Sequence, residues 1–157
     1  MLVESSVCEE SPVNPPPLKL HALRIQTSED DLPADRFNNH VNNARYFHFI
    51  NLTFQSWYRA MGIRGGIPDQ SAMMAHVSYD FRGELKPPTV AECRIDVSRV
   101  GVTSLEHAIE IFDLGLDGNQ TPNSVGRGRA VHVWVNRSAR SKMPWPTEVL
   151  SKCWPGE

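Results

Sequence analysis

The sequence of 157 residues has little of what marks several common classes of protein. Its three cysteines, Cys8, Cys93 and Cys153, lie far apart. They fit neither a disulfide framework nor a zinc-ligand spacing, so we expect reduced thiols. The formal net charge is only −2, which gives no reason to expect nucleic acid or an anionic membrane as a partner.

Long apolar runs and metal-ligand patterns are missing as well. No uncharged apolar stretch reaches the roughly 20 residues that a membrane-spanning helix needs. The N-terminus carries acidic residues where a secretory signal needs basic ones followed by an apolar stretch. His76, His107 and His132 do not have the spacing of a ligand set. We therefore expect a cytoplasmic protein without a membrane span, a metal or a cofactor.

Proline is concentrated near the N-terminus. Residues 1–17 are acidic and rich in serine, and they end in a run of prolines at Pro15–Pro17. Consecutive prolines lack backbone donors and favour extended geometry, so residues 1–17 are predicted to form a flexible leader. Residues 18–157 are enough for one domain with a real hydrophobic core.

The hydrophobic pattern between Asn43 and Met61 is helical, because apolar side chains recur at three- and four-residue steps. These side chains are Phe47, Ile50, Phe54, Trp57 and Met61. Other apolar residues occupy the remaining faces, and a helix that is apolar nearly all round is predicted to be buried. Gly62 should end it.

The rest of the domain alternates with a period of two, which is typical of strands. A first strand is predicted from Leu18 to Ile25, and four more follow the helix. Their apolar members are Met73, Ala75, Val77, Tyr79 and Phe81; Ala91, Cys93, Ile95 and Val97; Leu105, His107, Ile109 and Ile111; and Val131, Val133 and Val135. The pattern predicts an α+β domain, with an antiparallel sheet of about five strands wrapped around one long central helix.

The segment before the helix, residues 35–46, gathers one acid, one histidine and four asparagines. A long apolar stretch without a charged side chain follows it, which favours an active-site loop over an ordinary solvated one. Asn42 and Asn43 stand where a helix N-cap is expected. The backbone N–H groups left free there, together with the helix dipole, could hold a developing oxyanion.

The run His40-Val-Asn-Asn-Ala-Arg-Tyr46 resembles the Gly-His-Val-Asn-Asn-x-x-Tyr signature of hotdog-fold thioesterases of the 4-hydroxybenzoyl-CoA thioesterase-like superfamily. The segments 79–85 and 126–135 are similar to two strands of that family. The resemblance implies a single hotdog domain whose sheets join edge to edge in a homodimer or a dimer of dimers, with active sites between protomers. It also implies hydrolysis of an acyl-CoA or acyl-carrier-protein thioester by water, without a metal.

The family acid usually lies four residues before this histidine, where the present chain has Arg36, and the nearest acid is Asp35. We assign Asp35 as general base or direct nucleophile, because hydrolysis needs one of the two. His40 would orient the carboxylate or the water, Asn38 would position the water, and the N–H near Asn43 would serve as oxyanion donor. Each of these residues could instead be an ordinary cap, turn or loop-base residue.

Other carboxylates and a set of binding residues complete the prediction. Asp30 and Asp31 are the alternative bases. Asn42, Tyr46, Met73 and Tyr79 are assigned to substrate binding. Methionine and aromatic side chains such as Met73 and Tyr79 are, however, more often plain core. Arg127 and Arg129 could meet the CoA phosphates or the acidic helix of a carrier protein, or could form a solvated rim.

Two other functions stay open on the sequence. Hotdog hydratases and dehydratases, which act on enoyl or hydroxyacyl thioesters, use Asp-x-Asn-Pro-x-His, with the same spacing as Asp35 and His40. This chain lacks the Asn-Pro pair, and its Val-Asn-Asn favours the thioesterases. A non-catalytic acyl-binding hotdog dimer is the other alternative. The acyl group, the pathway (lipid or polyketide) and the choice between dimer and tetramer are not determined by the sequence.

Overall fold

The structure is a computed structural model and describes residues 19–33, 39–63 and 67–154. The leader predicted at residues 1–17 lies outside these ranges. The elements in chain order are β1 (Leu20–Gln26), the 3-10 helix η1 (Glu29–Asp31), α1 (Asn43–Ala60), β2 (Gln70–Phe81), β3 (Val90–Val100), β4 (Ser104–Asp113), β5 (Asn123–Asn136), β6 (Ser141–Lys142) and α2 (Thr147–Cys153).

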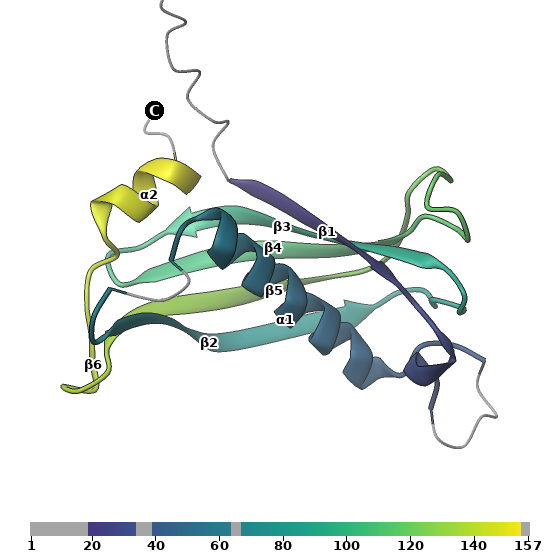
Figure 1. The fold of residues 1–157 in the computed structure, drawn as a ribbon, viewed down its shortest axis with the longest axis horizontal. Coiled ribbons are helices and arrows are strands. Elements are labelled where there is room, and N and C mark those ends of the chain that lie inside the picture. The colour runs from purple at the N-terminus through teal and green to yellow at the C-terminus, as the bar shows by residue number, and fades with distance from the viewer. Residues whose placement is uncertain (1–18, 34–38, 64–66, 155–157) are drawn as a thin grey trace, which may run out of the picture.

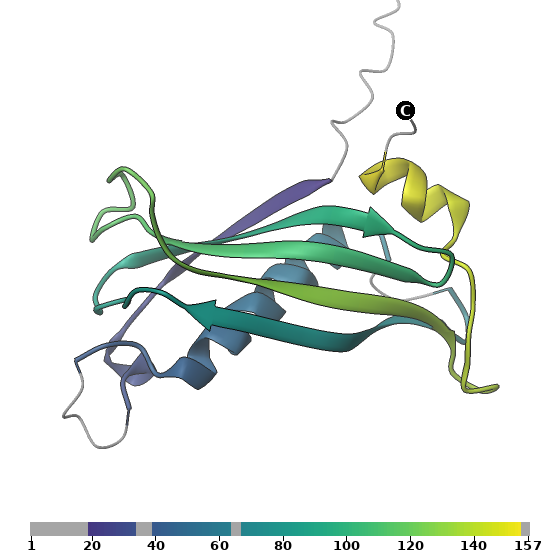
Figure 2. The ribbon, with the colours of Figure 1, turned by 180° about the vertical axis from the view of Figure 1, so that it is seen from behind.

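The strands form one antiparallel sheet in the order β1-β3-β4-β5-β2, and the two-residue strand β6 pairs with β5. The long helix α1 lies across one face of this sheet (Figure 1). No helix of the described residues covers the other face, as the view from behind shows (Figure 2). A long helix held by a curved antiparallel sheet is the hotdog arrangement, so the predicted fold class is confirmed. Within the described residues, β6 is the only strand beyond the five that were predicted.

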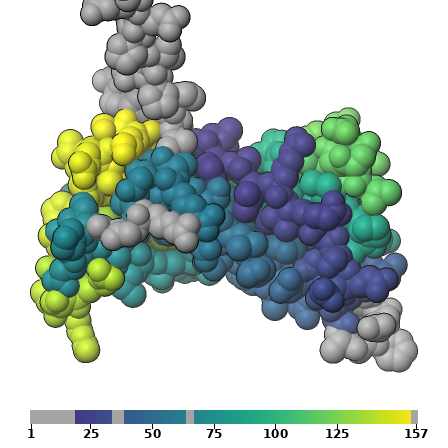
Figure 3. All heavy atoms as spheres, viewed as in Figure 1, coloured from purple at the N-terminus to yellow at the C-terminus, as the bar shows by residue number. Residues whose placement is uncertain are grey.

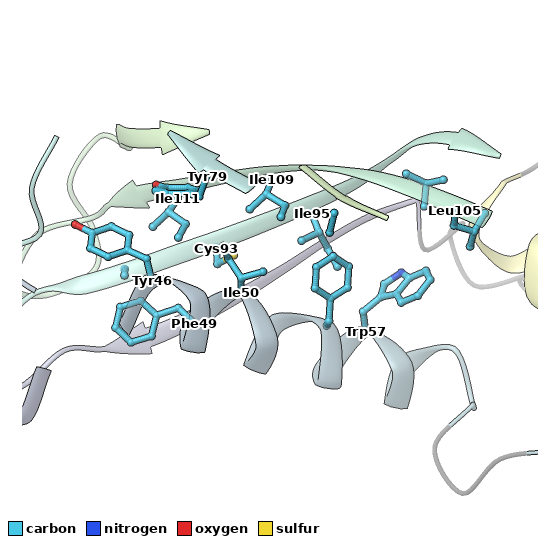
Figure 4. Close-up of a cluster of buried hydrophobic side chains, with 14 of the residues drawn as sticks. Tyr46, Phe49, Ile50, Trp57, Tyr79, Cys93, Ile95, Leu105, Ile109 and Ile111 are labelled. Atoms are coloured by element: carbon cyan, nitrogen blue, oxygen red, sulfur yellow. The ribbon is translucent and has the colours of Figure 1, made fainter. Parts of the chain in front are cut away.

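The core lies between α1 and the inner face of the sheet. Its side chains come from α1 on one side and from strands β2, β3, β4 and β5 on the other (Figure 4). The buried residues of α1 are Tyr46, Phe49, Ile50, Thr53, Phe54 and Trp57. The prediction of a helix buried nearly all round is wrong in part, because Phe47 is 38% exposed and Ala60 is also exposed. One face of α1 is therefore left open.

A β-bulge in β2 overturns part of the predicted alternation. The register of β2 against β5 shifts between Met74 and His76, so Met73 pairs with Val133 while Met74 pairs with His132. The extra residue moves Met73 to the outer face, away from Tyr79, because one inserted residue reverses the direction of every side chain on one side of it.

The side chains of the last long strand, β5, alternate between two faces, and the set that contains His132 is the buried one. Ala130, His132 and Trp134 face the core, while Val131, Val133 and Val135 lie half-buried on the outer face. Gly126 leaves room for a side chain of β2, because a Cβ there would come within 2.6 Å of the Tyr79 phenol oxygen. The small residues at the start of this strand therefore serve close packing.

The C-terminal segment closes one end of the core. The space-filling view shows it beside the end of α1 (Figure 3). Trp145, Val149 and Cys153 are each at most 3% exposed, and the rings of Trp134 and Trp145 lie 5.1 Å apart. The segment forms the short helix α2, which adds to the core as well as to the surface.

Candidate active site at the start of helix α1

The N-terminus of α1 presents a free backbone donor. Asn42 is the N-cap, and its side-chain oxygen accepts a hydrogen bond of 3.0 Å from the Ala44 N–H. The Arg45 N–H donates to the Asn42 carbonyl at 2.8 Å. The Asn43 N–H has no hydrogen-bond partner among residues 19–33, 39–63 and 67–154, and Asn43 itself is exposed. This donor lies at the positive end of the helix dipole, where a negative charge is stabilised.

Asp31 ties the loop to this helix start. Its carboxylate accepts a 2.8 Å bond from the Ser28 N–H on one oxygen and receives Arg45 at 2.7 Å on the other. Its carbonyl accepts from the Asn42 N–H at 2.8 Å. Asp31 is 3% exposed, so this is a nearly buried, fully engaged acid. Both oxygens are occupied, which makes Asp31 a structural residue and not a free base.

The backbone of Leu85 holds the junction from the other side. The Val41 N–H donates to the Leu85 carbonyl at 2.8 Å, and the Leu85 N–H donates to the Tyr46 hydroxyl at 3.1 Å. Val41 and Tyr46 are both buried, so the residues between them have little freedom. Tyr46 thus has a positioning role in the fold, beyond the substrate contact that was predicted for it.

His40 lies half-buried next to this junction. Its Nδ1 is 3.1 Å from the Val41 carbonyl oxygen. Because a carbonyl only accepts, Nδ1 must carry the proton in this bond, and the neutral ring then has Nε2 as an acceptor. His40 can therefore orient a water or a carboxylic acid through Nε2.

An aromatic cluster extends from the helix start to the edge of the sheet. The ring centroids of Tyr46 and Tyr79 are 5.6 Å apart, those of Tyr79 and Phe81 are 5.0 Å apart, and those of Phe47 and Phe81 are 6.3 Å apart. Phe47 and Phe81 are 38% and 40% exposed, so the cluster opens to the surface. Tyr79 is 8% exposed, and burial raises the pKa of its phenol.

The Tyr79 hydroxyl has no hydrogen-bond partner in the described residues. A buried polar group without a partner costs about 1–3 kcal/mol. Tyr79→Phe is therefore expected to leave the free energy of unfolding unchanged or to raise it, which urea unfolding would measure. A clear loss of stability would show that the hydroxyl has a partner. If the hydroxyl also binds substrate, kcat/KM of the same variant would fall while its stability does not.

Three predicted binding residues lie away from this helix start. Met73 is on the outer face of the sheet and is 54% exposed, because the bulge in β2 reverses its direction. Arg127 and Arg129 are also on that face, where they pair with Glu110 and Glu106. The structure brings Asn42, Asn43, His40, Tyr46 and Tyr79 to one end of α1. Asp35 and Asn38 lie outside the described residues.

Within the described ranges, no group of three or more histidine, cysteine or acidic side chains is placed to hold a metal ion. No helix in the described part of the chain is long and apolar enough to cross a membrane.

Comparison with protein families assigns the chain. The family described as the thioesterase-like superfamily matches residues 26–153, which is most of the sequence. The chain belongs to this superfamily. The matched range runs from the end of β1 through α2, so it includes the polar loop, the start of α1 and the whole described sheet apart from most of β1. A comparison with curated protein sequences found no match.

Solved structures show the same fold. The PA5185 protein of Pseudomonas aeruginosa superposes with a TM-score of 0.70 at 25% identity, covering 85% of this chain and 88% of its own. A 1,4-dihydroxy-2-naphthoyl-CoA thioesterase from Synechocystis gives 0.73 at 14% identity, covering 87% and 96%. A variant of 4-hydroxybenzoyl-CoA thioesterase in complex with 4-hydroxybenzoyl-CoA gives 0.74 at 10% identity, covering 86% and 99%.

Proposed function

We propose that the protein hydrolyses acyl-CoA thioesters to a free acid and a thiol at the N-terminus of α1. The observation that carries this proposal is the Asn43 N–H, which has no partner in the described residues and lies beside His40 at the start of a long helix. Such a donor suits the oxyanion that forms when a thioester carbonyl is attacked. Membership of the thioesterase-like superfamily supports the same chemistry.

The proposed reaction uses the loop before the helix. Asp35 takes a proton from water as the water oxygen bonds to the thioester carbon, and Asn38 positions that water. The oxyanion accepts from the Asn43 N–H, and the carbon–sulfur bond then breaks to release the thiolate, which takes up a proton. Nε2 of His40, as an acceptor, would orient the water. Direct attack by Asp35, through a mixed anhydride that water later opens, is the alternative route.

A homodimer fits the open edge of the sheet. The edge strand β2 is 12 residues long, and Met74 and Phe81 on its inner face are 37% and 40% exposed. Helix α1 reaches this face through the rings of Tyr46 and Phe47, and it leaves Met74 and Phe81 partly exposed. A long, exposed, apolar edge strand is a ready template for pairing with another chain. We infer that two copies pair along β2, which would place each helix start near the partner protomer.

The CoA ester is the first substrate class to test. Two of the similar structures are named as thioesterases of 1,4-dihydroxy-2-naphthoyl-CoA and 4-hydroxybenzoyl-CoA. A carrier-protein thioester is the other acyl donor that we consider. The exposed aromatic rim of Phe47 and Phe81 favours an acyl group with an aromatic or aliphatic body over a small polar one.

The test is a thiol-release assay with a panel of acyl-CoAs, covering aromatic, medium-chain and β-keto acyl groups. Release well above the buffer rate for at least one of them supports the proposal. If none is released, the same acyl groups are offered on a carrier protein, and enoyl-CoA absorbance is followed to detect a hydratase. Activity only in the enoyl assay would replace hydrolysis by hydration. Silence in all assays, with acyl-CoA binding detected by calorimetry, would indicate a non-catalytic acyl-binding protein.

A further inference from the structure

Two histidines face each other inside the core, on the side of the sheet that α1 covers. His107 on β4 is 0% exposed and His132 on β5 is 1% exposed. Their ring centroids are 5.6 Å apart with the rings nearly perpendicular, at 88°. His107 pairs in register with Ala130, which places His132 at the diagonal position of the next strand. The fold, and not their spacing in the sequence, brings them together.

The C-terminal half of α1 covers this pair with aromatic rings. Phe54 contacts both imidazoles, with centroid distances of 5.0 Å to His107 and 4.4 Å to His132. Trp57 lies 4.8 Å from His107, and Tyr58 lies 5.7 Å from His132. The histidines are therefore the contact between sheet and helix at this level of the core.

The flanking strands add no charge to this environment. Val97 of β3 stands opposite His107, and Met74 of β2 stands opposite His132. Among the ring contacts of the described residues, one further titratable group meets the pair, the Tyr58 phenol, whose pKa is raised by burial, so it stays neutral. No salt bridge or cation–π contact between described residues involves either imidazole.

Three of the four ring nitrogens lack partners in the described residues. Both nitrogens of His107 and Nδ1 of His132 are buried without a hydrogen bond in the described part of the chain. Burial, with a smaller effect of His132, lowers the pKa of His107 to about 3, and burial lowers the pKa of His132 to about 4. A protonated ring here would have neither water nor an anion to compensate its charge.

We propose that His107 and His132 form an acid-sensitive latch between the sheet and α1, which holds the helix while both rings are neutral and releases it when either ring takes up a proton from solvent. The proton adds to a ring nitrogen and no other bond changes. The charged imidazolium then gains its hydration only if Phe54 and Trp57 move away. Because the start of α1 carries Asn42 and Asn43, releasing the helix also removes the candidate site.

The direction of the pH effect follows from linkage. Both histidines have a folded pKa below the unfolded value of 6.5, so the unfolded chain binds more protons between the two values. The stability that depends on neutral rings is complete above pH 6.5 and is lost as the pH falls toward about 4. Each ring should raise the unfolding constant by about tenfold per pH unit in that window.

Urea unfolding of the full chain between about pH 7 and about pH 4.5 measures this proton uptake. The wild type should take up nearly two protons on unfolding, beyond any contribution from carboxylates. His107→Leu and His132→Leu should each lower that number by about one, and the double variant should lower it by about two. His76→Leu, at an exposed position of β2, is the matched control and should leave the uptake as in the wild type.

The ¹⁵N NMR chemical shifts of the imidazole nitrogens in the wild type give a second readout. This readout does not require any variant to fold. At about pH 5.5 the proposal expects both core rings in the neutral form while the protein is folded. Protonated core imidazoles in folded protein, or a double variant whose proton uptake equals that of the wild type, would overturn the latch. The latch rests on the packing of α1 alone, so it can fail while thioester hydrolysis stands, and the reverse also holds.

Discussion

Replacing Asp35 by asparagine is expected to slow thiol release by about 10²–10⁴-fold, the range typical for loss of a positioned general base. Asparagine keeps the size of the side chain, but its neutral amide cannot take the proton from water or attack the thioester carbon. Asp31 cannot replace it, because its carboxylate is committed to Ser28 and Arg45. The assay compares kcat for one good acyl-CoA substrate in the two proteins, after gel filtration has shown the same assembly.

Asp30→Asn is the matched control for this substitution. Asp30 belongs to the neighbouring 3-10 helix and is exposed, so the same chemical change there should leave kcat within about twofold. Equal activity of Asp35→Asn and wild type would move the base to another residue. Equal losses in both variants would point to a general effect of charge on the loop, and the role of Asp35 would then be wrong.

Phe54→Ala is expected to lower the free energy of unfolding by about 3–5 kcal/mol, because it removes a large side chain from a core that cannot fully collapse. Phe54 is 1% exposed and packs on Trp57, Tyr58, His107 and His132. The rings around it come from three different elements, so the cavity would separate α1 from the sheet. Equilibrium unfolding in urea at neutral pH measures the loss.

Gln55→Ala, at the next position of α1, is the control for this effect. Gln55 is exposed, and alanine is the best helix former, so the change in stability should stay within about 0.5 kcal/mol. A loss below about 1 kcal/mol for Phe54→Ala would contradict the burial of this face of α1.

Much of the fold could be predicted from local patterns. The three- and four-residue steps of apolar side chains from Phe47 to Met61 identify α1 to within one residue at its end. Strands β3 and β4 bury the predicted set, because strict alternation needs no knowledge of the rest of the sheet. Asn42 was recognised as a cap because its amide can satisfy a backbone donor two residues on.

Features that depend on register could not be predicted from these patterns. The bulge in β2 reverses Met73 and Met74, and nothing in the sequence around Ala75 marks it. In β5 both alternating sets are largely apolar, so the pattern alone does not say that His132 and Trp134 face the core. His107 and His132 are 25 positions apart, and only the pairing of β4 with β5 makes them neighbours.

The candidate site divides in the same way. The residue types alone predict the polar loop and the start of the helix. The Asp31–Arg45 ion pair cannot be predicted in this way, because it forms only when the loop folds back onto α1. A signal for Asp31 was present, since Ser28 and Asp31 have the spacing of a capping box. The outward direction of Arg127 and Arg129 could not be predicted, because a register shift at Val125 lies between the start of β5 and these residues.

Hydrolysis of an active acyl-CoA in water enriched with ¹⁸O tests the central claim most directly. Hydrolysis at the start of α1 predicts that the wild type releases one thiol for each acid formed, that the acid contains the heavy oxygen, and that Asp35→Asn loses both signals together. The absence of thiol release from folded wild-type protein with every acyl-CoA and carrier-protein thioester offered would contradict it.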